Sequence, residues 1–189
     1  MAQRAAFRAR VAALEPERLV FVDESGVDTR LVRRYARAPA GARAVGTAPV
    51  SYDRLTIVGA LSATGLVAPS TSERAMNTAA FLTYLDAGLI PTLVAEQPEA
   101  IVVLDNLRPH HAAAVREKLA AAGLGLLYLP PYSPDYTPIE LAWSKVKTRL
   151  RTVAVRTRAA LEAAVPPALA TISGTDARGY FSHCGYNLL

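Results

Sequence analysis

The pattern of hydrophobic and polar positions along the chain predicts alternating strands and helices. Apolar runs rich in β-forming residues are typical of buried strands. The two clearest are "LVFVD", residues 19–23, and "IVVLD", residues 101–105. Thr64 and Gly65 separate two further runs and indicate a hairpin-like turn. The predicted strands are residues 19–23, 54–63, 66–69, 101–105 and 124–129.

Amphipathic stretches between the apolar runs predict helices over residues 77–93, 109–122, 138–151 and 158–172. Gly123 is a typical residue just beyond a helix end. Pro166 and Pro167 should break or kink the last helix, because proline lacks the backbone N–H that a helix interior needs. This order of elements favours a mixed α/β domain with a partly parallel sheet.

Length and composition favour one globular domain. The chain has 189 residues, of which 51% are hydrophobic, and this is enough for a real core. We see no internal repeat and no linker long enough to divide it. Residues 1–18 are interpreted as a basic lead-in and residues 152–189 as a helical extension.

Targeting signals and cysteine pairs are missing from the sequence pattern. No apolar run approaches the roughly 20 residues of a membrane span, and the start "MAQRAAFRAR" is not followed by a secretory signal pattern. Cys184 is the single cysteine, which argues against a disulfide framework and a cysteine-based zinc site. We therefore expect a cytoplasmic protein without a membrane partner.

The charge of the chain favours an anionic partner. The formal net charge is +5, and only three of the 21 basic residues are lysines. Arginine has a planar fork that suits phosphate oxygens, although an Ala-rich, Arg-rich chain also fits a GC-rich source. Basic residues concentrate in two segments, where a solvated helix face is the usual explanation. The candidate DNA contacts in them are Arg33, Arg34, Arg37, Lys145, Lys147, Arg149 and Arg151.

Three acidic residues stand out from this pattern. Asp23 and Asp105 each end an apolar strand, where a carboxylate is costly unless something pairs with it or coordinates it. One such Asp could be a cap or a turn residue, but two on separate strands are harder to dismiss. Glu140 lies in the first turn of a predicted helix, after a stiff segment with four prolines. Proline at a helix start is common, yet the prolines could also fix where Glu140 points.

The spacing of these acids resembles the catalytic triad of mariner-like DDE transposases, in particular their bacterial insertion-sequence branch. Asp105 and Glu140 have 34 residues between them. The resemblance extends over nearly the whole chain, and its most specific part is the Pro-rich block before Glu140. Thr137 stands where the family usually has Asn, and Thr can cap a helix too. The segments that carry the resemblance are "VFVDESG", "YARAPAG", "VLDNLRPHH", "LPPYSPDYTPIELAWSKVK" and "DARGYFSHCGY".

The resemblance implies an RNase H-like fold with Asp23 and Asp105 on neighbouring strands and Glu140 on a helix nearby. It implies catalysis and binding of two Mg²⁺ or Mn²⁺ ions by these three acids, since divalent cations relieve the repulsion among clustered carboxylates. The implied reaction is phosphodiester hydrolysis at element ends by water, and then attack of the freed 3′ hydroxyl on target DNA. The implied partner is double-stranded DNA bound by a homodimer, in the bacterial nucleoid.

Three polar residues beside the acids could support them. Glu24 follows Asp23 and should face away from it on a continuing strand, which suggests a structural or supporting role. Asn106 and His110 lie just after Asp105, where either could contact phosphate or a metal-bound water. A capping Asn and a surface His are the favoured interpretations.

Other residues of the Pro-rich region have simpler interpretations. Asp135 is expected to be a turn residue rather than the third acid. Trp143 shares a helix face with Glu140 and is expected in the core. Tyr128 and Tyr132 are expected to pack rather than to stack on bases.

Three rival functions compete with this interpretation. A P-loop ATPase is rejected, because the chain has no Gly-rich phosphate loop ending in Lys-Ser or Lys-Thr. A host nuclease of the same fold, such as a ribonuclease H or a junction resolvase, stays open. So does an inactive DNA-binding remnant, although all three acids are present.

The start of the chain bears on DNA recognition. Mariner-like transposases carry helix-turn-helix modules ahead of the catalytic domain, and the 22 residues before Asp23 are too few for one. We therefore expect a catalytic half, either a second reading frame joined by frameshifting to a separately encoded helix-turn-helix half, or a truncated copy. Such a half should bind DNA weakly and without sequence preference.

Overall fold

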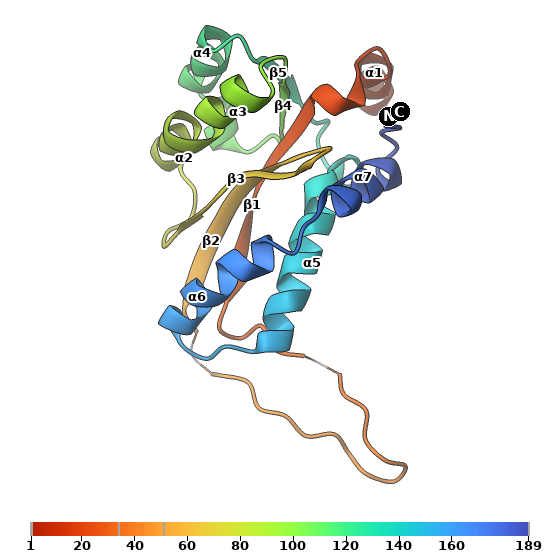
Figure 1. Cartoon of the computed structure of the whole chain (residues 1–189), viewed down its shortest axis with the longest axis vertical. Coiled ribbons are helices and arrows are strands. Elements are labelled where there is room, and N and C mark those ends of the chain that lie inside the picture. Colours follow the sequence, from red (N-terminus) through yellow and green to blue (C-terminus); the bar gives the residue numbers. More distant parts are fainter. Residues whose placement is uncertain (1, 34, 51, 189) are drawn as a thin grey trace.

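The computed structural model describes residues 2–33, 35–50 and 52–188. Within them, five strands form one sheet of order β3-β2-β1-β4-β5 (Figure 1). β1 pairs antiparallel with β2 and parallel with β4, and β5 continues the parallel half. The predicted mixed, partly parallel sheet is confirmed. The strands are β1 (Leu19–Asp28), β2 (Arg54–Ser62), β3 (Gly65–Ser72), β4 (Ile101–Leu104) and β5 (Gly125–Tyr128).

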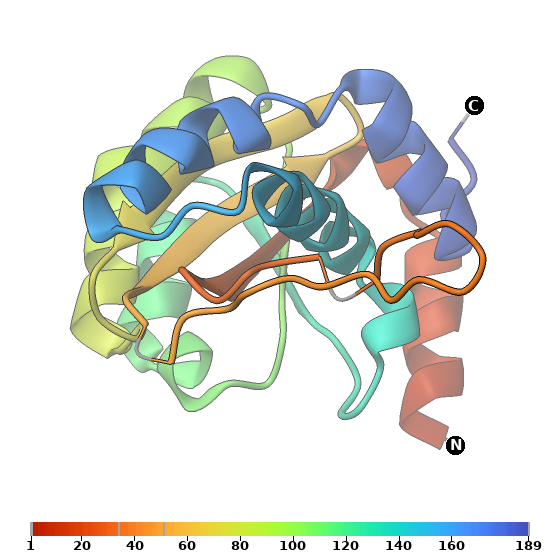
Figure 2. The same ribbon diagram turned by 90° about the horizontal axis from the view of Figure 1, so that it is seen from below.

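Helices cover both faces of the sheet (Figures 1 and 2). A π-helical turn, Leu85–Leu89, joins α2 to α3, so these form the single helix predicted from the sequence. Short 3₁₀ turns occupy Pro16–Arg18, Arg108–His111 and Pro134–Tyr136. The α-helices are α1 (Ala2–Ala12), α2 (Thr78–Tyr84), α3 (Ile90–Glu96), α4 (Ala113–Ala121), α5 (Pro138–Val153), α6 (Arg158–Leu169) and α7 (Gly174–His183).

Alternation along β1 divides the core into two layers. Leu19 and Phe21 pack in the layer formed with α1, α5, α6 and α7. Val20 and Val22 pack on the other face, with α2, α3 and α4. Successive strand residues point to opposite faces, so an acid on β1 belongs to one layer and its neighbour to the other.

Both ends of the chain contain helices, with two differences from the sequence prediction. The lead-in before β1 forms α1, whose Phe7 and Val11 are buried, with Phe7 stacked on Tyr136 at a centroid distance of 5.5 Å. The expected break at Pro166 and Pro167 is wrong, because α6 continues to Leu169. Both prolines are exposed, while the buried stripe of α6 holds the helix on the core.

The 19-residue helical stretch Thr78–Glu96 contains an 18-residue window with a mean hydropathy of 1.4, so by length and composition it could cross a membrane. The expectation that no such run exists is therefore wrong. Phe81, Leu85, Leu89 and Leu93 are nevertheless buried against the sheet. A core helix of a globular domain accounts for this stretch.

The connection between β1 and β2 extends away from the sheet as a long, irregular loop (lower part of Figure 1). Most of its described residues are exposed, and Tyr35 is 90% exposed. Arg37 lies in this loop, and Arg34 lies outside the described residues.

Candidate active site

Strand register brings the two aspartates together. β1 and β4 run parallel with Leu19 beside Ile101 and Phe21 beside Val103. Continuing that register places Asp23 level with Asp105, which directly follows β4. Asp23 shares the parity of Phe21, so its side chain belongs to the face covered by α5, whereas Asp105 lies just beyond the end of β4.

Helix α5 brings Glu140 to the same face. It packs across β1 and β2, and its Trp143 donates a hydrogen bond from Nε1 to Asp23 Oδ2 at 3.1 Å. Gly59, which pairs with Asp23 on β2, leaves room for this ring, because a Cβ there would lie 3.2 Å from Trp143 Cη2. Glu140 is exposed one helical turn before Trp143.

The Pro-rich segment ends in a tight turn that starts α5. Thr137 occupies the N-cap position, but its side chain makes no capping bond and Oγ1 instead donates to Ser133 O at 3.3 Å. The expected capping role of Thr137 is therefore wrong. The first-turn backbone is held by Glu140 N, which donates to Thr137 O at 3.1 Å. This turn fixes the start of α5 and with it the position of Glu140.

The electrostatics show that the acids share one environment. Burial, followed by the negative charges of Glu140, Glu24 and Asp105, raises the pKa of Asp23 to about 7 from its usual 3.8. Glu24, on the other face of β1, contributes to this shift as well. Asp23, midway along β1, is thus level with Asp105 just after β4, and it contacts α5 one turn after Glu140.

A buried histidine links Asp105 to Glu24. His110 is fully buried, with Nδ1 2.6 Å from Asp105 Oδ1 and Nε2 3.1 Å from Glu24 Oε1. The predicted surface His is wrong, because its ring packs at 4.4 Å from that of Phe81 under α2. Glu24 faces away from Asp23, as predicted, and its hydrogen bond with His110 links it to Asp105.

The surroundings of His110 favour the charged form of its ring. Burial alone would lower its pKa, but hydrogen bonds to Asp105 and Glu24 raise it to about 9. For Asp105 burial has the opposite effect and would raise the pKa. Hydrogen bonds from His110 and from the Leu107 N–H nevertheless hold the pKa of Asp105 below its usual range. An imidazolium that donates from both nitrogens fixes the Asp105 carboxylate in one orientation.

Several residues near the acids have structural roles. Asn106 donates from Nδ2 to Leu129 O at 2.6 Å, which ties the loop after β4 to β5 and replaces the expected capping role. Asp135 lies in a 3₁₀ turn and accepts a hydrogen bond from Arg4 Nη1 at 3.0 Å, as expected for a turn residue rather than a third acid. Trp143 is in the core, as predicted.

The two tyrosines of this region differ. Tyr128 packs as predicted, with its ring stacked on His111 at 4.4 Å and its hydroxyl donating to His110 O at 2.8 Å. The prediction that Tyr132 packs is wrong, because it is 99% exposed.

The donor set fits a divalent cation, although the side chains do not form a ready-made site. Among the described residues, no group of three His, Cys, Asp or Glu side chains is placed to hold an ion. Asp23 accepts a hydrogen bond from Trp143, and Asp105 lies against His110. The crowding that raises the pKa of Asp23 is what a cation would relieve, and hard oxygen ligands suit Mg²⁺ or Mn²⁺.

The basic residues of α5 divide between two flanks of the helix. Lys147 and Arg151 lie within about 20° of Glu140 around the helix axis, whereas Arg149 lies about 180° away. Arg33 donates to Thr152 Oγ1 at 3.3 Å and so lies at the far end of the same helix. Lys145 differs from the expectation of a free DNA contact, because its Nζ pairs with Asp176 on α7 at 2.7 Å.

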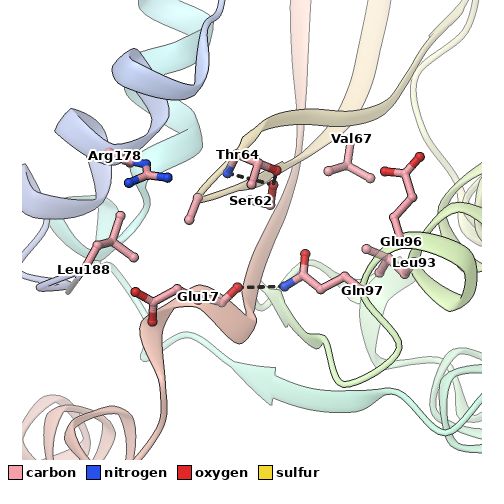
Figure 3. Close-up of a pocket in the computed structure, with 10 residues that line it drawn as sticks. Glu17, Ser62, Thr64, Val67, Leu93, Glu96, Gln97, Arg178 and Leu188 are labelled. Carbon is pink, nitrogen blue, oxygen red and sulfur yellow. Dashed lines mark hydrogen bonds between the residues drawn. The ribbon is translucent and has the colours of Figure 1, made fainter.

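A separate pocket of about 430 Å³ lies at the other end of the sheet (Figure 3). Figure 3 shows Ser62 and Thr64 on one side of it and Glu17 and Gln97 on the other. Gln97 Nε2 donates to the Glu17 carbonyl at 2.7 Å. Glu17 and Gln97 precede β1 and β4, whereas Asp105 follows β4, so this pocket is remote from the acids.

The profile of one protein family, the DDE superfamily endonucleases, matches residues 18–162, which include all three acids. The chain belongs to this family. Among curated proteins, none matches the chain.

Solved structures of Mos1 transposase share the fold. The paired-end complex with the left transposon end has a TM-score of 0.77 and 18% identity, over 96% of this chain and 56% of that chain. The mariner paired-end complex with Mn has a TM-score of 0.75 and 17% identity, over 97% and 56%. The isolated Mos1 catalytic domain has a TM-score of 0.70 and 16% identity, over 98% and 86%. This chain thus spans little more than half of the transposase in those complexes, and its predicted RNase H-like fold is confirmed.

Proposed function

We propose that the chain is the catalytic domain of a mariner-like transposase of the bacterial insertion-sequence type. Its substrate is double-stranded DNA, in which it hydrolyses phosphodiesters at element ends and joins the freed strand to target DNA. The observations that support the proposal are the register that sets Asp23 level with Asp105 and the hydrogen bond from Trp143, one helical turn after Glu140, to Asp23. The Mos1 complexes with transposon ends support DNA as the partner, and a homodimer in the cytoplasm is part of the proposal.

Asp23, Asp105 and Glu140 would hold the divalent ions, Mg²⁺ or Mn²⁺, which when bound supply positive charge to the attacking and leaving oxygens of a displacement at phosphorus. The chain's own residues prepare the ligands for this. Trp143 orients Asp23 from the α5 side, and His110 orients Asp105 from the opposite layer. Two rigid elements thereby fix two ligands that would otherwise repel each other.

The flank of α5 that carries Glu140 would hold the DNA backbone. Lys147 and Arg151 continue that flank over about 16 Å of helix, and Arg33 lies at its far end. Within the described residues, neither Lys147 nor Arg151 has an acidic partner. Phosphate contacts of this kind position DNA but carry no base information, so sequence preference should be weak in this chain.

The test is strand cleavage of a supercoiled plasmid by the purified chain. Cleavage should require Mg²⁺ or Mn²⁺ and stop in Ca²⁺. Asp23→Asn, Asp105→Asn and Glu140→Gln should each abolish it, because the loss of a ligand removes transition-state stabilisation. Asp135→Asn is the matched control, since its carboxylate faces Arg4 and not the three acids.

The outcomes separate the proposal from its rivals. Cleavage of an RNA–DNA hybrid in preference to duplex DNA would point to a host nuclease instead. Metal-independent cleavage, or full activity of Glu140→Gln with a dead Asp135→Asn, would show that the acids are wrongly assigned.

A further inference from the structure

Tyr132 occupies the tip of the Pro-rich loop without a partner. It is 99% exposed, and no hydrogen bond, ring contact or cation–π contact involves it in the part of the chain that the structure describes. Burial of an aromatic ring is a large favourable contribution to folding, and Tyr132 forgoes it. The ring therefore contributes nothing to the stability of this domain.

The backbone at this position is unfavourable for a tyrosine. Tyr132 has a φ of +53°, in the left-handed region that favours glycine. Strain at a residue that stabilises nothing else in the fold suggests that the side chain itself is used. Glycine would form the same turn without the strain, and it would lack only the ring.

The loop holds this ring close to the acids. Leu129 N donates to Leu104 O at 2.9 Å, and Leu129 O accepts from Asn106 at 2.6 Å, so Leu129 is tied on both sides of Asp105. Tyr132 is three residues further, which is at most about 11 Å of chain. Ser133, the next residue, is buried and accepts at its carbonyl from Tyr136 N at 3.1 Å. The ring is thus presented by a fixed loop within a few nucleotides of a strand held at Asp105.

The surroundings of the loop suit a polyanion with planar groups. Asp135 is the one acid in the described loop, and Arg4 pairs with it. A cavity of about 380 Å³ beside the loop is lined by Arg10, Asn106 and Tyr128 and by apolar residues that include Pro130 and Pro131. Single exposed aromatic rings commonly stack on unpaired bases.

We propose that Tyr132 stacks on an unpaired nucleobase of the DNA strand bound at the three acids. This inference rests on the proposed function, since it needs DNA at Asp105. It adds a contact to a base face, which the cationic flank of α5 does not provide. The contact favours distorted or unpaired DNA next to the cleavage position over a continuous duplex.

The experiment compares the binding of a blunt duplex and of the same duplex with a short unpaired tail, in Ca²⁺. The wild type should prefer the tailed duplex. Tyr132→Ala and Tyr132→Gly should lose roughly fivefold to a hundredfold of affinity for the tailed duplex only, and Tyr132→Phe should keep it. Tyr35→Ala is the control, because Tyr35 is similarly exposed but lies on the loop between β1 and β2.

The direct readout is 2-aminopurine in the tail, whose emission is quenched by stacking. Wild type and Tyr132→Phe should quench it, and Tyr132→Gly should not, although the glycine relieves the strain of the turn. If Tyr132→Gly bound and quenched like the wild type, the inference would fail while the proposed function stood. The inference would also fail if Tyr132→Ala altered self-association and not binding to the tail. A chain that neither binds nor cleaves any DNA would overturn the proposed function, and the inference with it.

Discussion

Replacing Asp23 by Asn should stabilise the metal-free protein while destroying its proposed activity. Asn keeps the shape of the side chain and can still accept the hydrogen bond from Trp143 Nε1. It removes the negative charge that burial, Glu140, Glu24 and Asp105 all disfavour. The substitution therefore separates the stability of the fold from the function of the site.

The size of the effect follows from the pKa of Asp23, which is raised from 3.8 to about 7. At 1.36 kcal/mol per unit, the upper limit is about 4 kcal/mol. Between these two pKa values the folded state holds a proton that the unfolded state has released, so the free energy of unfolding of the wild type falls as the pH rises. The advantage of Asp23→Asn should be absent near pH 4 and largest above pH 7.

Urea unfolding in EDTA, followed by circular dichroism at several pH values, measures this difference. Addition of Mg²⁺ should stabilise the wild type more than the variant, because a ligand that binds only the folded state raises its stability. A variant that is less stable than the wild type at pH 8, or a difference that does not change with pH, would refute the reasoning.

Three further predictions concern the residues around the acids. Arg151→Ala should weaken binding to all duplexes and reduce the salt slope by about 1, while Arg149→Ala on the opposite flank of α5 should leave the slope unchanged in a fluorescence anisotropy titration. If Arg151→Ala and Arg149→Ala changed the salt slope equally, the flank of α5 that carries Glu140 would not be the DNA-binding one. His110→Gln should lower Mn²⁺ affinity about tenfold to a hundredfold, because Asp105 loses its orienting partner. Calorimetry measures this affinity, and an unchanged value would show that His110 only packs in the core. Lys145→Ala should lower the unfolding free energy only slightly and leave DNA affinity unchanged, since its pair with Asp176 is partly exposed. A loss of DNA affinity without a change in stability would show that Lys145 contacts DNA.

Much of the fold and the acids themselves were predictable from local pattern. Asp23 and Asp105 follow apolar runs that are typical of buried strands. The predicted strand end at Asp23 is wrong, because β1 continues to Asp28, but the parallel register of β1 and β4 still sets the two acids at one level of the sheet. Glu140 follows from the proline-marked helix start. Helix α1 could also have been predicted, because Phe7, Val11 and Leu14 have helical spacing, although the basic residues around them obscured the pattern.

The remaining features depend on contacts between distant residues. Trp143 was predicted in the core, but its hydrogen bond to Asp23 depends on how α5 crosses β1 and on the space left by Gly59. His110 could not be assigned, because its partner Glu24 is 86 positions earlier and on the other face of β1 from Asp23. Tyr132 follows from backbone conformation, which residue type does not reveal, since tyrosine usually packs.

The most direct test of the central claim is the position of Mn²⁺ in crystals of the protein soaked in manganese. Anomalous scattering locates the ion independently of any assumption about ligands. We predict a peak bounded by the carboxylates of Asp23, Asp105 and Glu140, with Asp23 deprotonated, and no peak there in crystals of Asp23→Asn. A peak at another group of acids, or an unchanged peak in Asp23→Asn, would contradict the assignment of these three residues as the metal-binding site.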